Sequence, residues 1–125
     1  MNGRDIKRAL KGYPVIVTGS DAIKLYKNTF CLTNTRPRSE KGKHWVVVYY
    51  PTVGPLEFFD SLSKSPVHYG PYFRRMRHYF KTKTRVQSYR SSNCGNLCVL
   101  YIKLRSAGYT LAEIEEWMKR LTLPL

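Results

Sequence analysis

Acidic residues are scarce in this chain of 125 residues, which carries 22 Lys and Arg against 8 Asp and Glu and a formal net charge of +14. No acidic residue lies between Ser61 and Ala112. A field of one sign attracts polyanions, of which nucleic acid is the commonest, whereas phosphate contacts alone give no sequence specificity. The alternative is a basic surface that only keeps the protein soluble. The candidates for phosphate contact are Arg74, Arg75, Arg77, Lys81, Lys83 and Arg85.

Long apolar runs and abundant cysteines are also missing. No stretch is apolar for long enough to span a bilayer, and residues 1–12 lack the continuous apolar segment of a secretory signal. Three cysteines in such a chain indicate free thiols in a reducing compartment, and their spacing from histidines argues against a zinc site. Because 42% of the residues are hydrophobic, we expect one folded domain over residues 1–125.

The apolar pattern predicts an α+β domain with a small, mostly antiparallel sheet flanked by helices. Thr110 and Glu113 are spaced as a capping box before a last helix. Its buried stripe is expected to consist of Leu111, Ile114, Met118 and Leu121. Strands are expected at 15–17, 30–33, 45–50, 56–59 and 84–89, and helices at 4–11, 20–25, 72–79, 95–107 and 111–121.

A hairpin brings a histidine and an aspartate together. The turn between the strands 45–50 and 56–59 is centred near residue 52 or 53, which places His44 opposite residue 60, 61 or 62. Asp60 then lies at the same end of the hairpin, with its Cβ roughly 5 Å from that of His44 if the two are directly opposite, whereas Glu57 points to the other face. A carboxylate beside an imidazole fixes its tautomer. The alternative is a surface pair that only closes the hairpin.

Cys94 opens the predicted helix 95–107, where the positive end of the helix dipole favours a thiolate. Cys98 fits the buried stripe of that helix, and Cys31 lies in an apolar strand, so both are expected in the core. Gln87, seven residues before Cys94, carries a side-chain amide that could donate to an oxyanion together with the Cys94 N–H. Trp45 is expected either to wall a substrate groove or to pack on the sheet.

The order His44-Trp45, Asp60, Gln87 and Cys94-Gly-Asn-Leu-Cys resembles the adenovirus-type cysteine endopeptidases (adenain), related to the SUMO- and ubiquitin-like-specific proteases. The resemblance covers roughly residues 13–106 and suggests a compact viral or Polinton-like member with a papain-like fold. It implies a catalytic set of His44, Asp60 and Cys94, with Gln87 at the oxyanion. Adenain proper uses Glu where this chain has Asp60, and the wider family uses Asp.

The resemblance further implies a monomer in the virion and host nucleus that cleaves virion precursors with glycine near the cleaved bond. The chemistry requires no cofactor, and DNA and a peptide are candidate activators. No Cys lies between Asp60 and Gln87, where the family's activating peptide forms its disulfide. Two other functions stay open: a deubiquitinase or deSUMOylase of the same family, and a non-catalytic basic domain that binds nucleic acid.

Overall fold

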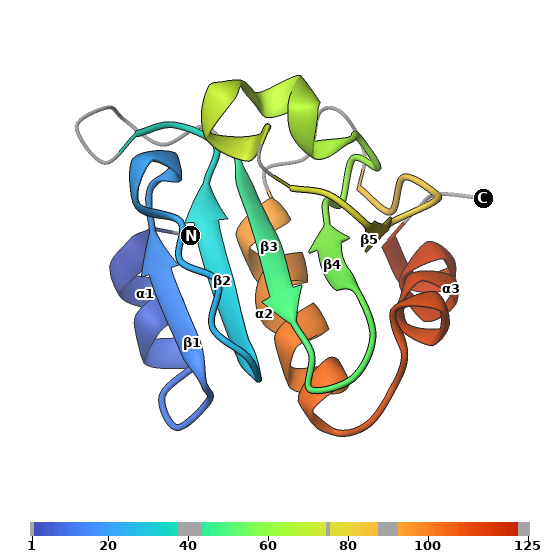
Figure 1. The fold of residues 1–125 in the computed structure, drawn as a ribbon. Coiled ribbons are helices and arrows are strands. Elements are labelled where there is room, and N and C mark those ends of the chain that lie inside the picture. Colours follow the sequence, from blue (N-terminus) through green and yellow to red (C-terminus); the bar gives the residue numbers. More distant parts are fainter. Residues whose placement is uncertain (1, 38–43, 75, 88–92, 123–125) are drawn as a thin grey trace.

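The computed structural model, drawn in Figure 1, describes residues 2–37, 44–74, 76–87 and 93–122. These residues form a mixed five-stranded sheet in the order β1-β2-β3-β4-β5. The two central pairs, β2–β3 and β3–β4, are antiparallel, and the two edge pairs are parallel. The strands are β1 Val15–Thr18, β2 Thr29–Asn34, β3 Trp45–Tyr50, β4 Leu56–Phe59 and β5 Tyr79–Lys81.

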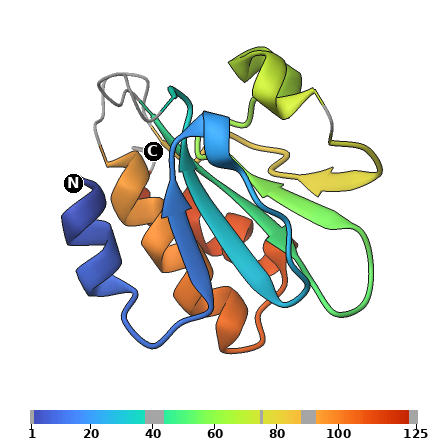
Figure 2. The same cartoon turned by 60° about the vertical axis from the view of Figure 1, so that its left-hand side comes forward.

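Three α-helices among the described residues cover one face of the sheet, as the two views in Figures 1 and 2 show. They are α1 Gly3–Ala9, α2 Cys94–Ser106 and α3 Leu111–Thr122. Three short 3-10 helices complete the described elements: η1 Ser20–Ala22, η2 Pro66–Tyr69 and η3 Pro71–Phe73. The prediction of an α+β fold is confirmed. Within the described residues, no helix combines the length and apolar character that crossing a membrane requires.

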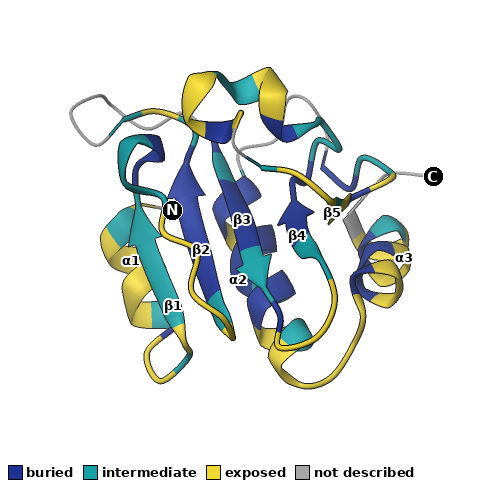
Figure 3. Ribbon diagram, in the orientation of Figure 1, coloured by how far each residue is buried: buried dark blue, intermediate teal, exposed yellow. Residues whose placement is uncertain are grey.

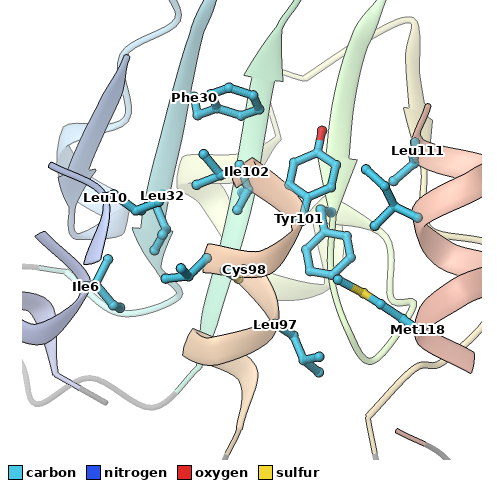
Figure 4. Packing of buried hydrophobic residues seen from close by; sticks show 14 of the residues in the cluster. Ile6, Leu10, Phe30, Leu32, Leu97, Cys98, Tyr101, Ile102, Leu111 and Met118 are labelled. Carbon is cyan, nitrogen blue, oxygen red and sulfur yellow. The ribbon is translucent and has the colours of Figure 1, made fainter. Parts of the chain in front are cut away.

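The core has two parts because side chains alternate across the strands. On the helical face, Val47 and Phe59 pack with residues of α1, α2 and α3, including Tyr101 and Met118 (Figure 4). On the opposite face, Phe73 of η3 packs on the buried side chains Cys31, Val46, Val48 and Phe58. Helix α2 is buried along most of its length between the sheet and the other helices (Figure 3). The start of this helix, from Cys94 to Cys98, is therefore held in the interior.

The predicted helix at 72–79 is wrong. Gly70 and His78 both adopt positive φ angles, +105° and +52°, which interrupt a right-handed helix. Between them, the single turn of η3 buries Phe73 against the sheet. The chain then extends into β5, which pairs with β4.

The predicted strand at 84–89 is also wrong over residues 84–87, and residues 88–89 lie outside the described part. The backbone N–H groups here bond elsewhere: Thr84 to the Glu115 carboxylate of α3, and Val86 to the Ser61 carbonyl at 2.8 Å. The capping box at Thr110 and Glu113 is present, with bonds of 3.0 and 3.2 Å. Leu121, expected to be buried, is 61% exposed, so that part of the prediction is wrong.

Candidate active site

His44 and Asp60 meet at one end of the β3–β4 hairpin. The His44 Nε2 lies 2.7 Å from the Asp60 Oδ1, and the two residues are 8% and 0% exposed. In the observed register Val47 lies opposite Phe59, so continuing it places His44 opposite residue 62 and Asp60 diagonally across. The two are thus on the same face, although not directly opposite, and the long imidazole closes the diagonal distance.

Glu57 points to the other face of the sheet, as its position in the strand predicts. Its carboxylate accepts hydrogen bonds from the Tyr101 hydroxyl at 2.7 Å and from the Arg105 guanidinium at 2.9 Å. These contacts tie β4 to α2. They also leave Asp60 as the carboxylate next to His44.

Four donors from the described residues surround the Asp60 carboxylate. Oδ1 accepts from His44 and from the Leu62 N–H at 3.0 Å, and Oδ2 accepts from the Lys64 N–H at 3.1 Å and from the Tyr69 hydroxyl. Burial raises the pKa of Asp60, but the bonds from His44 and Tyr69 outweigh it, so the pKa lies below its usual value. Asp60 is therefore ionised at neutral pH and held in one orientation.

Tyr69 was missed by the sequence reasoning. Its ring also lies against the imidazole, with the centroids of Tyr69 and His44 5.6 Å apart. Tyr69 ends η2, in a Pro- and Gly-rich segment with no periodic signal. Only the path of that segment back over the sheet brings it to Asp60, and no local pattern could have revealed this contact.

Cys94 is the first residue of α2 and is 7% exposed. Its side chain hydrogen-bonds to His44 and to the backbone of Trp45. Because Asp60 occupies the Nε2 of His44, Nδ1 is the ring nitrogen that faces the thiol. Burial raises the pKa of Cys94, but the bonds to His44 and Trp45 and the charge of His44 bring it below its usual value.

The pKa of His44 is raised, whereas that of Cys94 is lowered. Burial lowers the pKa of His44, but the hydrogen bonds and charges of Asp60 and Cys94 together raise it to about 9. A raised imidazole pKa and a lowered thiol pKa together favour a thiolate–imidazolium pair. That pair is the reactive form of a cysteine nucleophile.

The other two cysteines are buried thiols of the core. Burial raises the pKa of both Cys31 and Cys98. The Cys98 thiol, one turn after Cys94, donates to the Trp45 carbonyl at 3.3 Å. Within the described residues, no group of three or more His, Cys, Asp or Glu is arranged to hold a metal ion.

Gln87 is buried at 4% exposure, and its Oε1 accepts a hydrogen bond from the Ser61 hydroxyl. This contact orients the side-chain amide so that its NH2 group points away from Ser61. Ser61, directly after Asp60, is a second residue that the sequence reasoning did not single out. Residues 88–92, which join Gln87 to α2, lie outside the described part.

The six basic candidates for phosphate contact differ in their surroundings. Arg74, Arg77 and Lys83 are exposed. Lys81 is half-buried and donates to the Thr82 carbonyl at 2.6 Å, and Arg85 is half-buried and donates to the Gln87 carbonyl at 3.2 Å. Arg75 lies outside the described residues.

Known proteins similar to this chain are viral cysteine proteases. It is 31% identical over 121 residues to the cysteine protease S273R of African swine fever virus (isolate Tick/Malawi/Lil 20-1/1983), which covers 83% of this chain and 44% of the relative. It is also 31% identical over 121 residues, with the same coverage, to the SUMO-1 cysteine protease S273R of isolate Pig/Kenya/KEN-50/1950. No protein-family model matches the chain. The chain spans less than half the length of these curated relatives, and the similarity relates it to viral cysteine proteases, in agreement with a papain-like fold.

Proposed function

We propose that this chain is a cysteine peptidase with Cys94 as nucleophile, His44 as general base and acid, and Asp60 as the residue that orients His44. One observation carries the proposal: a buried His44 bonds to Asp60 at 2.7 Å through one nitrogen and to the Cys94 thiol at its other side. The viral cysteine proteases to which the chain is similar support the same chemistry.

In the proposed reaction, the Cys94 thiolate attacks the scissile carbonyl carbon and the carbonyl π electrons move to oxygen. Collapse of the tetrahedral intermediate breaks the C–N bond, and the His44 imidazolium gives its proton to the leaving amine. Neutral His44 then takes a proton from water as that water attacks the thioester. The C–S bond breaks, the acid product leaves, and the thiolate–imidazolium pair is restored.

Gln87 is proposed to donate to the developing oxyanion together with the Cys94 N–H at the start of α2. The support is the contact with Ser61, which holds the Gln87 oxygen and directs the donor end of the amide away from Ser61. One donor of this type contributes about 3 kcal/mol to transition-state stabilisation. Trp45, whose backbone contacts Cys94, is proposed to wall the adjoining substrate groove.

The proposed substrates are virion precursor proteins with glycine near the cleaved bond, as implied by the resemblance to adenain. A deSUMOylase or deubiquitinase is the second candidate, because some of the similar viral proteins carry the name SUMO-1 cysteine protease. Nucleic acid is the proposed activator, supported by the net charge of +14, and a peptide activator is a further candidate. We propose that the protein acts as a monomer in the virion and host nucleus.

Cleavage of a fluorogenic peptide containing Gly-Gly, and of SUMO and ubiquitin conjugates, tests the proposal. Cys94→Ala should abolish cleavage. Cys31→Ala should retain cleavage, because Cys31 lies on the face of the sheet opposite to the one that α2 covers. Iodoacetamide near neutral pH should modify Cys94 faster than the other two cysteines. Cleavage by Cys94→Ala would refute the assignment, and salt-sensitive DNA binding without any cleavage would favour the non-catalytic basic domain.

A further inference from the structure

A pocket of about 550 Å³ is lined in part by Trp45, the residue that follows His44. Its walls come from the first turns of α1, the carboxyl ends of β1 and β2, and the first residue of β3. The volume lies in the range of roughly 300 to 1,000 Å³ that is usual for ligand sites. Figure 2 shows α1 next to the first turn of α2, the helix that begins at Cys94.

Three cationic residues line this pocket: Arg4 and Lys7 of α1, and Arg36 just after β2. Arg4 and Lys7 are three residues apart, so they share one face of the helix. Arg4 and Lys7 are exposed, and neither forms an ion pair within the described part of the chain. No described residue that lines the pocket is acidic. Arg4 and Lys7 therefore give the α1 side of the pocket a positive potential.

Trp45 links this pocket to the candidate nucleophile. Its side chain lines the pocket, and the Cη2 end of the indole lies 3.9 Å from the position that a Cβ on Gly3 would occupy. Its backbone hydrogen-bonds to the Cys94 side chain. An extended chain advances roughly 3.3 to 3.6 Å per residue, so a substrate residue a few positions from the scissile bond can reach the pocket.

We infer that this pocket is a specificity subsite that takes an acidic side chain, Glu or Asp, of the polypeptide substrate. The inference rests on the proposed peptidase function. The indole, Val17 and Pro37 provide apolar surface for the side-chain methylenes, and the cations at the rim bind the carboxylate. A nucleic-acid strand would need cations spread along an open track, whereas these cations surround one concavity.

Peptide binding to the inactive Cys94→Ala variant tests the subsite without relying on turnover. The probes are fluorescein-labelled peptides with a central Gly-Gly, in which Glu is moved through the flanking positions, and the same peptides with Gln. At one position Glu should bind roughly tenfold more tightly than Gln, as expected for a charge-assisted contact. Anisotropy titrations at fixed ionic strength measure the ratio.

The ratio should fall close to one in Lys7→Gln and Arg4→Gln. Arg8→Gln is the matched control, because Arg8 is an exposed cation of the same helix that does not line the pocket. An equal fall in the Arg8 variant, or no Glu preference at any position, would overturn the subsite. So would a drop in DNA affinity in Lys7→Gln but not in Arg8→Gln without any peptide preference, because that result identifies a phosphate site.

Turnover by the unmodified protein separates the two proposals. Cleavage of all the peptides with equal kcat/KM for Glu and Gln would keep the peptidase and refute the subsite. A Glu preference in binding without cleavage of any peptide would refute the peptidase and leave the pocket only as a binding site for an acidic side chain. A Glu preference in both measurements that disappears from both in Lys7→Gln supports both.

Discussion

At the residue scale, the Tyr69 hydroxyl is the one side-chain group other than His44, among the described residues, that bonds to the Asp60 carboxylate. Tyr69→Phe removes this donor and keeps the ring beside His44. We expect kcat to fall severalfold with KM nearly unchanged, and the free energy of unfolding to fall by about 1 to 2 kcal/mol. Because the hydrogen bond lowers the pKa of Asp60, its removal should move the acid limb of the rate profile to higher pH.

Tyr72→Phe is the control for this change. Tyr72 lies three residues further on, is 42% exposed, and should alter neither the rate profile nor stability. A stability loss in Tyr69→Phe with an unchanged kcat and pH profile would show that Tyr69 only packs against the sheet.

The His44–Cys94 pair predicts a pH dependence with a defined sign. The pKa of His44 is raised from 6.5 to about 9, so the stabilisation of the fold by the protonated form is complete below about pH 6.5 and is lost as the pH rises through about 9. The same protonated His44 gives its proton to the leaving amine, so kcat/KM should decline above about pH 9. In Asp60→Asn the decline should move to lower pH, because the carboxylate that raises the His44 pKa is gone. An alkaline limb that does not move would contradict the role given to Asp60.

At the scale of elements, the contact between Glu57 and Arg105 fixes α2 to β4. Arg105→Met leaves the buried Glu57 carboxylate without its cation, and we expect the free energy of unfolding to fall by roughly 2 kcal/mol. The decrease should be smaller than for a fully buried pair because 21% of the Arg105 side chain is exposed. Urea denaturation measures it, and adding Glu57→Gln should recover part of the stability.

Arg120→Met provides the comparison for that measurement. Its guanidinium lies 3.8 Å from Glu116 and is 76% exposed, so its removal should change stability by less than about 0.5 kcal/mol. Equal effects of the two substitutions would mean that the Glu57 contact contributes no more than a surface pair.

The elements that the sequence predicts are those with strong local signals. Strand β3 is a β-branched and aromatic run, and the start of α3 has a capping box that forms as expected. Segment 72–87 could not be predicted, because its path depends on contacts far away in the chain. Phe73 packs on the sheet, and the Thr84 N–H bonds to a carboxylate on α3.

Within the candidate site, too, the features with local sequence signals were predicted and the long-range contacts were not. Strand parity predicted that His44 and Asp60 share a face, and the helix start singled out Cys94. Tyr69 and Ser61 escaped because their roles depend on where a loop returns to the sheet. Lys81 and Arg85 donate to backbone carbonyls. A count of charges could not predict these contacts, because they too depend on the path of the loop.

At the scale of the whole molecule, the charge of +14 predicts salt-dependent binding to DNA. Of the six basic candidates, Arg74, Arg77 and Lys83 are exposed, and we predict that these three contact phosphate. Changing all three to Gln should reduce the slope of log Kd against log salt by up to about 0.9 for each phosphate that the variant no longer neutralises. Fluorescence anisotropy with a DNA duplex at several salt concentrations measures this slope.

A second triple variant separates location from total charge. Lys11, Lys24 and Lys103 are exposed lysines elsewhere on the molecule, and changing them to Gln removes the same charge. This variant should lower the slope less. Equal slopes in the two triple variants would show that DNA responds to net charge and has no preferred face.

The hairpin that holds His44 and Asp60 joins residues only sixteen apart, whereas Cys94 arrives on a helix much later in the chain. Short loops close before long ones, so the base and its acid can assemble during folding before the thiol reaches them. In the unfolded chain Cys94 is an ordinary thiol with a pKa near 8.5. Its lowered pKa therefore arises only when α2 docks on the sheet, so the fraction of this sulfur that is thiolate at neutral pH rises once the site has assembled.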